Sequence, residues 1–401
     1  MTDVKDIGKL EEDSRLVELL GSDAFIADPF PVYAELRKRP GWRAPSGYFV
    51  FGGYQDVITI LKAPDVFGQE TRPQPSFHVL DPPDHTRIRR LVSRAFTPRS
   101  IERRRESVSG IADRLIDECV DDHEMDLIEQ FAKRLPAMVI SSLLDIPLED
   151  GRRWEHYLNA MTASRGLAHY LTTDTEHRAQ LDETRRKVSR EQADFLAALI
   201  EERRGGDDRD DIVTQLLRAR DEDDALSTDE VLFTLLLFLG AGMHTTAAQI
   251  GNTMKLLLER PELVDTLKER PDLLPNALEE ALRIEGSLQG EHRLVRKATT
   301  LAGLELKVGN RVIIINGSAN HDPAVFPQPD EFNIFRDNAR EHLTFGWGIH
   351  LCLGASLARL ELQTGVEKLL GRLPGLRLAG PPVYQPYDRF RALDSLVVRW
   401  D

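Results

Sequence analysis

The sequence has very few cysteines and no long apolar segment. Cys119 and Cys352 are the only two thiols among its 401 residues, which excludes a disulfide framework and any zinc or iron–sulfur site that needs four thiolates. So few cysteines are typical of a reducing compartment, and we expect the protein to be cytoplasmic. The longest strongly apolar run, Val231 to Gly242, is too short to cross a bilayer as a helix. It therefore predicts a buried core helix and no membrane partner.

Positive charge is also scarce, because 52 Lys and Arg stand against 66 Asp and Glu and the formal charge is −14. This balance argues against a nucleic-acid-binding protein, which needs concentrated cations to neutralise phosphates. The first residues, MTDVKDIGKLEEDSRL, lack the basic, apolar and small-residue order of a secretory signal. The rest is an ordinary globular composition, with 41% hydrophobic and 29% charged residues.

Helical periodicity extends over most of the chain between residues 84 and 284. Ser227-Thr-Asp-Glu230 precedes the apolar run in the order of an N-terminal capping box, and so predicts the start of a long helix. A short helix is also expected over 31–38 and a longer one from about 353 to 373. The helices expected in between lie near 84–96, 100–120, 124–144, 150–167, 175–203, 208–219, 227–259 and 261–284.

Short strands are expected near both ends of the chain. Gly47 to Phe51, followed by Gly52-Gly53, indicates a hairpin, and the segments Leu301 to Leu306 and Arg311 to Ile315 read as strands. Sheet pieces that lie so far apart in sequence must pair across the chain. We therefore expect a mainly α protein with a minor β-sheet, folded as a single domain over residues 1–401.

The strongest local signal is the decapeptide FGWGIHLCLG, residues 345–354. Its glycines let the backbone turn tightly, and Gly354 lets a following helix start close against a flat object. Cys352 lies at the start of that helix, where backbone N–H groups favour a thiolate. One thiolate without a neighbouring Cys suits a metal whose other ligands come from a cofactor, and haem iron fits this description. The alternative is an inert cysteine in a Gly-rich turn.

This decapeptide resembles the haem-binding loop of the cytochrome P450 family. Glu280-Ala-Leu-Arg283 resembles the Glu-x-x-Arg signature of the family's K helix, and Arg336 occupies the position of its third partner. Read alone, Glu280 and Arg283 would be an ordinary surface ion pair. The resemblance implies that the three residues lock the loop under the haem. It also implies the family's single-domain fold, a triangular helical prism, and haem b held without covalent links, with the Cys352 thiolate on the iron.

Residues 81–89, DPPDHTRIR, resemble the start of the family's C helix. His85 and Arg89 share one helix face. The resemblance implies that they hold a haem propionate with His350 and with an arginine on the strand after Arg283. Arg293 fits the family spacing for that arginine, and Arg296 is the runner-up; such donors suit buried carboxylates. Further haem contacts are implied for Phe345, Gly346, Gly354 and Ala241.

The apolar helix carries Gly240-Ala-Gly-Met-His-Thr-Thr246, which resembles the family's I helix. A Thr hydroxyl can bond to the carbonyl one turn earlier and bend the helix, which leaves room for dioxygen and water. The resemblance implies that Thr245 guides protons to the dioxygen. His244 stands where most family members have an acid. With an unperturbed pKa of about 6.5 it could shuttle protons, contact a substrate acid, or satisfy a structural partner.

The resemblance implies a haem-thiolate monooxygenase that oxidises a small to medium organic substrate with dioxygen and two electrons. The chain carries no flavin or nicotinamide fingerprint, so a ferredoxin or flavodoxin with its reductase is implied as electron donor. Arg94, Arg99 and Arg103 to Arg105 are candidates for docking it, although a solvated helix face explains them equally well. The residues implied to line the substrate pocket are Phe77, His78, Val79, Leu237, Ala241, His244, Gln289 and Glu291.

Family analogy suggests a role in natural-product tailoring or aromatic catabolism. One alternative keeps the haem but changes the reaction to peroxide-driven oxygenation, phenol coupling or dehydrogenation, which would tolerate an altered proton relay. A second alternative is a non-enzymatic haem protein that senses a small molecule. The retention of Thr245 beside small residues argues against it, because passive binding needs no proton delivery.

Overall fold

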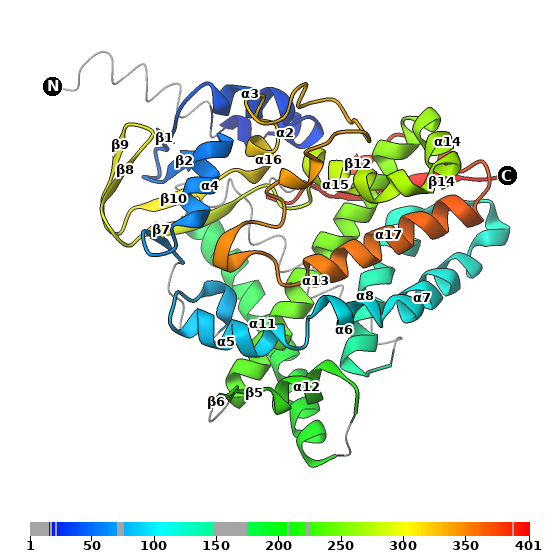
Figure 1. Cartoon of the computed structure of the whole chain (residues 1–401), viewed down its shortest axis with the longest axis horizontal. Helices are drawn as coiled ribbons and strands as arrows, with labels where there is room; N and C mark the ends of the chain where they lie inside the picture. The colour runs from blue at the N-terminus through cyan, green and yellow to red at the C-terminus, as the bar shows by residue number, and fades with distance from the viewer. Residues whose placement is uncertain are drawn as a thin grey trace.

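The computed structural model describes residues 16, 18–20, 22–69, 76–147, 175–206, 209–221, 224–386 and 389–401. Helices fill the centre, the right and the bottom of Figure 1, and most of the strands lie together at its left. The expected mainly α fold with a minor sheet is thereby confirmed. The helices are α2 (Asp23–Ala27), α3 (Phe30–Arg37), α4 (Tyr54–Lys62), α5 (Asp84–Ser93), α6 (Pro98–Glu102), α7 (Arg105–Asp117), α8 (Arg134–Leu144), α11 (Thr175–Gly205), α12 (Ile212–Arg218), α13 (Thr228–Leu258), α14 (Pro261–Glu269), α15 (Leu274–Ile284), α16 (Asn316–Ala319) and α17 (Ala355–Arg372).

Helix α13 runs through the middle of the molecule (Figure 1). The expected capping box is present, since the Ser227 side chain accepts from the Glu230 N–H and the Glu230 carboxylate accepts from the Ser227 N–H. The helix packs against α8, α11, α15 and α17, and its last thirteen residues, 246–258, are all buried. It is long and apolar enough to cross a membrane by length and composition alone, a test that core helices also pass. The expected helix is confirmed, but its buried part is mainly residues 246–258, since only Val231, Thr234, Leu235 and Leu239 of the apolar run are buried.

Several expected helices are interrupted in the structure. The segment 261–284 is divided into α14, the short turn η5 (Pro271–Leu273) and α15, because Pro271 has no N–H for a continuous helix. The segment 100–120 is divided between α6 and α7. The segment 124–144 begins with a strand, β4 (Glu124–Asp126), which pairs with the C-terminal strand before the chain turns into η3 (Ile128–Ala132) and α8. The helix expected over 150–167 lies outside the described residues.

The main sheet has five strands in the order β1-β2-β10-β7-β3. Strand β10 pairs parallel to β2 and antiparallel to β7, so the two ends of the chain meet as expected. The remaining strands form a three-stranded sheet and three two-stranded ones. The strands are β1 (Trp42–Arg43), β2 (Phe49–Phe51), β3 (Phe67–Gly68), β4, β5 (Arg220–Asp221), β6 (Asp224–Ala225), β7 (Glu291–Val295), β8 (Thr299–Leu301), β9 (Leu304–Leu306), β10 (Arg311–Ile314), β11 (Arg377–Leu378), β12 (Val383–Tyr384), β13 (Leu393–Ser395) and β14 (Val397–Arg399).

Two strand predictions were wrong in detail. The single strand expected over 301–306 is a hairpin of β8 and β9, because Ala302 and Gly303 both take positive φ angles, 52° and 77°. The hairpin expected at Gly52-Gly53 lies earlier in the chain, where β2 pairs with β1. Gly53 instead forms the N-cap of α4.

One buried carboxyl group in α17 has no partner that explains it. Glu361 is 2% exposed, and among the described residues nothing bonds to its Oε2 atom. Burial raises the pKa of Glu361 from 4.5 to about 8. The group is therefore protonated in the folded protein at neutral pH but ionised in the unfolded chain, so folding binds a proton.

A Glu361→Gln variant is expected to be more stable than the native protein at pH 7. The raised pKa means that the native free energy of unfolding falls as pH rises from 4.5 to about 8, by roughly 3 kcal/mol at pH 7. Glutamine has the shape of the neutral acid and does not ionise, so this loss disappears. Urea unfolding at pH 5 and pH 8 measures the effect. An equal pH slope in the two proteins would contradict the assignment of this carboxyl group.

Candidate functional site

The Cys352 loop is a tightly wound turn between Phe345 and the start of α17. Its ends are joined by a bond from the Cys352 N–H to the Phe345 carbonyl, 2.9 Å. Gly346 and Gly348 take φ angles of 70° and 71°, and a side chain at Gly348 would stand 2.7 Å from the Leu61 carbonyl oxygen. Glycine is thus required for the loop to pass so close to α4.

Cys352 precedes α17 by three residues, since Gly354 is the N-cap of that helix. Burial raises the pKa of the Cys352 thiol, although a bond from the Gly354 N–H and the charge of Arg89 act in the opposite direction. The expected effect of the helix start is therefore present in the bond from the Gly354 N–H, but burial outweighs it. The residue as a whole is nevertheless exposed. A buried thiolate here needs a bound cation to replace its proton, as haem iron would.

Glu280, Arg283 and Arg336 form one buried ionic network. The Glu280 carboxylate accepts two bonds from Arg283, at 2.7 and 2.9 Å, and one from Arg336, at 2.9 Å. The Asn333 N–H also donates to it, at 3.1 Å. The two guanidinium groups in turn donate to backbone carbonyls of the loop between residues 320 and 331. The network thus ties α15 to the irregular segment that leads to the Cys352 loop.

A second network beside it was missed from the sequence. Glu279 accepts two bonds from Arg359 of α17, at 2.6 and 2.9 Å, and one from His342, at 3.2 Å. These partners outweigh burial and lower the pKa of Glu279 to about 2. The Arg359 guanidinium also lies over the Phe345 ring, 4.5 Å from its centre. Phe345 is thus held in place from α15 and α17. The sequence gives no signal for this contact, because only the fold brings the two segments together.

Four expected propionate-binding groups lie together beside Cys352. The His85 and His350 rings are 4.3 Å apart, and Arg89 donates to the Leu351 carbonyl. Burial and the Arg89 charge lower the pKa of His85 to about 4. Burial, then the charges of His85 and Arg293, lower the pKa of His350 to about 3. The cluster therefore unites α5, β7 and the Cys352 loop.

Arg293 and Arg296 differ clearly in their surroundings. Arg293 is buried on β7, where it donates to the His292 carbonyl and pairs with Glu291 at 2.9 Å. Arg296 is half-buried and binds Asp81 and the Gln69 carbonyl. Arg296 holds Asp81 to the Gln69 carbonyl, whereas the charge of Arg293 lowers the pKa of His350. Arg293 is therefore the better candidate for binding the propionate.

An Arg293→Ala variant is expected to release haem faster, whereas Arg296→Ala is the matched control with an unchanged rate. A charge-assisted hydrogen bond to a buried carboxylate contributes about 1.5–3 kcal/mol, equivalent to roughly 10- to 100-fold in affinity. The rate of haem transfer to an excess of a haem-binding acceptor protein measures the loss. The reverse order of the two variants would assign the propionate to Arg296.

The small-residue stretch of α13 has the expected local bond. The Thr245 hydroxyl donates to the Ala241 carbonyl one turn earlier, at 2.6 Å. Ala241 has exposed surface although its helix is central. His244 is turned toward the C-terminal hairpin, where its Nε2 atom lies 3.2 Å from the Gln385 amide oxygen.

Several of the expected substrate contacts have partners of their own. Phe77 is buried in the main core and packs near His85. The Gln289 amide accepts from the Tyr33 hydroxyl and donates to the Gly286 carbonyl. The Glu291 carboxylate accepts from Asn316 and pairs with Arg293. Of the others, His78 bonds to Ser76, and Val79 and Leu237 are partly buried.

The residues around Cys352 fit a haem group. Both ring nitrogens of His85 and the Nε2 atom of His350 are buried, and the described residues offer them no partner. Buried polar atoms normally have one, and propionate oxygens would provide it. A single thiol inside the same cluster, on an exposed residue, has the chemistry of an axial ligand. The site would thus hold iron through Cys352 and the propionates through His85, Arg89, Arg293 and His350.

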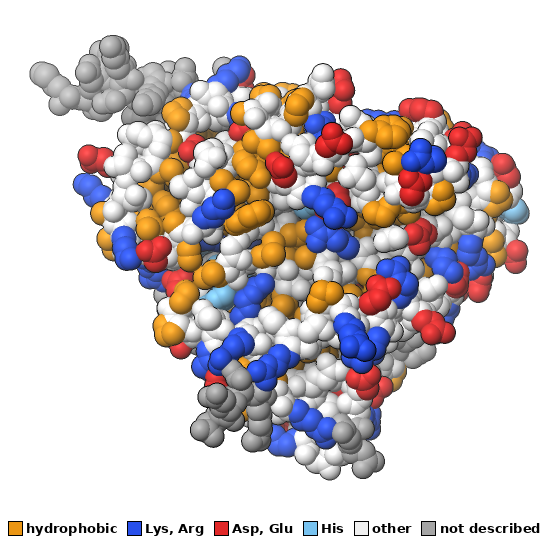
Figure 2. Space-filling view, in the orientation of Figure 1, with side chains coloured by type: hydrophobic (Ala, Val, Ile, Leu, Met, Phe, Trp, Pro, Cys, Tyr) orange, Lys and Arg blue, Asp and Glu red, His pale blue; other side chains and the backbone are white. Residues whose placement is uncertain are grey.

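The face in front of the Cys352 loop combines apolar and basic side chains. Trp347 and Leu351 are 40% and 44% exposed, and the Lys62 ammonium lies 5.5 Å from the centre of the Trp347 ring. Figure 2 shows blue side chains gathered over the lower half of this face, around α5 and α6. Of the expected docking arginines, Arg104 bonds to the Asp210 carbonyl and Arg105 to Glu102.

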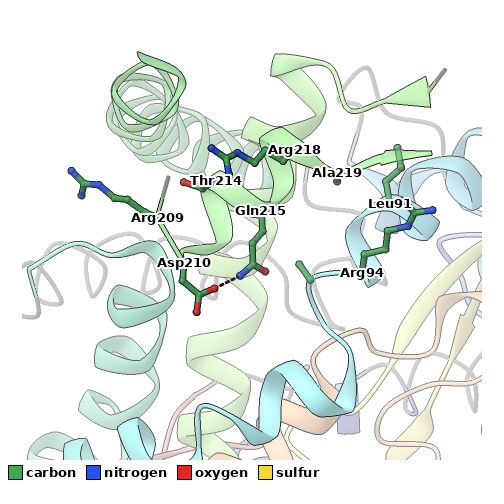
Figure 3. Close-up of a pocket in the computed structure, with 9 residues that line it drawn as sticks. Leu91, Arg94, Arg209, Asp210, Thr214, Gln215, Arg218 and Ala219 are labelled. Atoms are coloured by element: carbon green, nitrogen blue, oxygen red, sulfur yellow. Dashed lines mark hydrogen bonds between the residues drawn. The ribbon is translucent and has the colours of Figure 1, made fainter. Parts of the chain in front are cut away.

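A surface groove of about 510 Å³ lies between the end of α5 and α12, away from Cys352 and the expected propionate-binding residues. Figure 3 shows Arg94 on one side and Arg218 of α12 on the other, and the bond between Gln215 and Asp210. None of its lining residues belongs to the Cys352 loop or to the ionic networks. The groove is therefore not the reaction site.

Comparison with known proteins agrees with the geometry. Residues 62–374 match the family Cytochrome P450. The chain is 35% identical to the cytochrome P450 monooxygenase PikC of Streptomyces venezuelae, covering 95% of this chain and 93% of the relative. It is 36% identical to the 6-deoxyerythronolide B hydroxylase of Saccharopolyspora erythraea, covering 80% and 77%. Among solved structures, CYP109E1 from Bacillus megaterium in complex with testosterone superposes with a TM-score of 0.84 at 30% identity, covering 93% and 99%.

Proposed function

The chain belongs to the cytochrome P450 family, and from this premise we propose that it tailors a natural product by oxidising it at one carbon. Like the other members of this family, it is a monooxygenase that uses haem b with a cysteine thiolate ligand. The overall reaction uses the substrate, dioxygen, two electrons and two protons, and yields the hydroxylated product and water. The convergence of His85, Arg89, Arg293 and His350 on Cys352 is the observation that carries the proposal.

Cys352 is the proposed axial ligand, because Cys119 is buried in the core against Leu115 and Met125. When bound, haem supplies the oxygen chemistry, and a thiolate ligand favours cleavage of the O–O bond. Glu280, Arg283 and Arg336 support the loop indirectly, because they fix the segment that leads to it. Such support helps to orient the ligand.

Thr245 and His244 are the proposed proton-handling residues. The Thr245 hydroxyl donates its hydrogen bond to the Ala241 carbonyl, so its oxygen is left to accept a bond from a proton donor. His244 stands next to it on α13.

An organic substrate and a redox partner are required by the family's chemistry. We propose a ferredoxin or a flavodoxin with its reductase as the electron donor. An acidic carrier is favoured by the basic side chains around α5 and α6 (Figure 2). Arg99 and Arg103 are exposed there. We place the reaction in the cytoplasm and assign all 401 residues to one catalytic domain.

A macrolide or another polyketide is the proposed substrate class, since one relative is named for its action on 6-deoxyerythronolide B. Aromatic catabolism remains the second candidate. A panel of both compound classes, screened by the ferric spin-state shift, tests the assignment. A shift with polyketides and none with simple aromatic acids is expected, and the reverse would favour catabolism.

The reaction type is tested by comparing two oxidant systems with a substrate from that screen. Turnover with reduced ferredoxin and dioxygen is expected to exceed turnover with peroxide alone. Faster turnover with peroxide would favour the peroxide-driven alternative. Coupled or desaturated products would favour phenol coupling or dehydrogenation, and no oxidised product from either system would favour a sensor.

A further inference from the structure

His244 has a defined hydrogen-bond partner on only one side of its ring. Its Nε2 atom lies 3.2 Å from Oε1 of Gln385, which follows β12. The Gln385 amide nitrogen donates to the Leu393 carbonyl of β13, at 3.5 Å, so its oxygen is the atom presented to His244. Because that oxygen only accepts, the hydrogen of the neutral imidazole must sit on Nε2.

The other ring nitrogen, Nδ1, is an acceptor without a hydrogen-bond donor among the described residues. Nδ1 is buried, and no described residue bonds to it. The Phe390 ring packs against the imidazole in an edge-on arrangement, with centres 5.0 Å apart. Burial lowers the pKa of His244, and the charge of Lys133 acts in the same direction. The ring is therefore neutral near pH 7, and its Nδ1 atom has a lone pair and no proton.

We propose that Gln385 is a positioning residue, which fixes His244 as the Nε2–H tautomer so that Nδ1 holds an ordered water on the same turn of α13 as Thr245. Buried acceptors without a protein partner are commonly satisfied by such a water. The imidazole then orients the proton carrier and does not supply the proton. Each proton that the water passes on is replaced from solvent, and His244 stays neutral throughout. The inference rests on the proposed role of α13 in proton handling.

Nitrogen-15 NMR of the reduced, carbon monoxide-bound holoenzyme tests the tautomer without any turnover. The His244 signals are assigned by their loss in His244→Phe. The native protein is expected to show a protonated Nε2 and an unprotonated Nδ1 that accepts a hydrogen bond in substrate-free buffer. A proton on Nδ1, or an Nδ1 signal without a hydrogen bond, would overturn the proposal.

Gln385→Glu is the decisive variant. A carboxylate at this position raises the pKa of His244 and converts Nδ1 from an acceptor into a donor, so the Nδ1 signal is expected to move to that of a protonated nitrogen. Gln55→Glu, at an exposed site on α4, is the matched control with an unchanged His244 spectrum. Loss of the Nε2 proton in Gln385→Glu would contradict the positioning role, because a carboxylate oxygen accepts from Nε2–H as the amide oxygen does.

A third variant separates this role from mere support of the hairpin. Gln385→Met keeps the packing but offers no strong acceptor, so the preference for one tautomer is expected to fall roughly 2- to 10-fold, the equivalent of one hydrogen bond. Its carbon monoxide spectrum and Tm are expected to match those of the native protein. A normal tautomer ratio in Gln385→Met would overturn the inference even if the monooxygenase assignment holds.

Discussion

Glu280→Gln is expected to give little or no folded haem protein. The Glu280 carboxylate is fully buried and neutralises two buried guanidinium groups, those of Arg283 and Arg336. Removing one partner of a buried ion pair costs about 3–5 kcal/mol, which is a large share of the roughly 5–15 kcal/mol that stabilises a domain. Soluble yield, haem content and urea unfolding measure the loss.

The matched control for this prediction is Glu361→Gln, a second buried carboxyl group with the same substitution. Glu361 has no cationic partner among the described residues and is held neutral, so its replacement is expected to stabilise the protein. The two variants thus change stability in opposite directions. If both destabilised the fold to a similar extent, the network would not be the reason for the effect at Glu280.

Cys352→Ala is expected to abolish turnover and the spectrum of thiolate ligation. Loss of partners that merely support metal ligands costs roughly 10- to 100-fold in affinity or activity, and loss of the ligand itself should exceed this. Haem binding is weakened less, because His85, Arg89, Arg293 and His350 still hold the propionates. Activity and haem content, measured on the same preparation, separate the two effects.

Cys119→Ala is the control for the Cys352 variant. The Cys119 thiol is buried and its neighbours are the Leu115 and Ile116 carbonyls and the Met125 sulfur. Its loss should leave the haem spectrum unchanged and lower stability modestly. Thiolate ligation that survived in Cys352→Ala but disappeared in Cys119→Ala would reverse the assignment.

The fold and the turn that carries Cys352 could be predicted because they depend on short local patterns. The Cys352 loop needs glycine at two positive φ angles, and the Glu280–Arg283 pair lies on one turn of α15. Helical periodicity likewise indicated α13 and its cap. Each of these signals is contained within about ten residues, so one sequence is enough to reveal it.

Features that depend on distant pairing were not predictable. The bond between Glu279 and Arg359 joins α15 to α17, and the one between His244 and Gln385 joins segments 141 residues apart. The carboxylate of Glu291, expected to face a substrate, pairs with Arg293, a contact that the sequence did not indicate. Periodicity gives the face of a helix or strand on which a residue lies but not the partner that folding brings to it.

A carbon monoxide difference spectrum of the reduced native protein tests the central claim most directly. Ligation of haem iron by the Cys352 thiolate predicts the strongly red-shifted Soret band that distinguishes thiolate from imidazole ligation. The same band should be absent in Cys352→Ala. A native spectrum with the Soret band of histidine-ligated haem, or no haem absorption after reconstitution, would contradict the account.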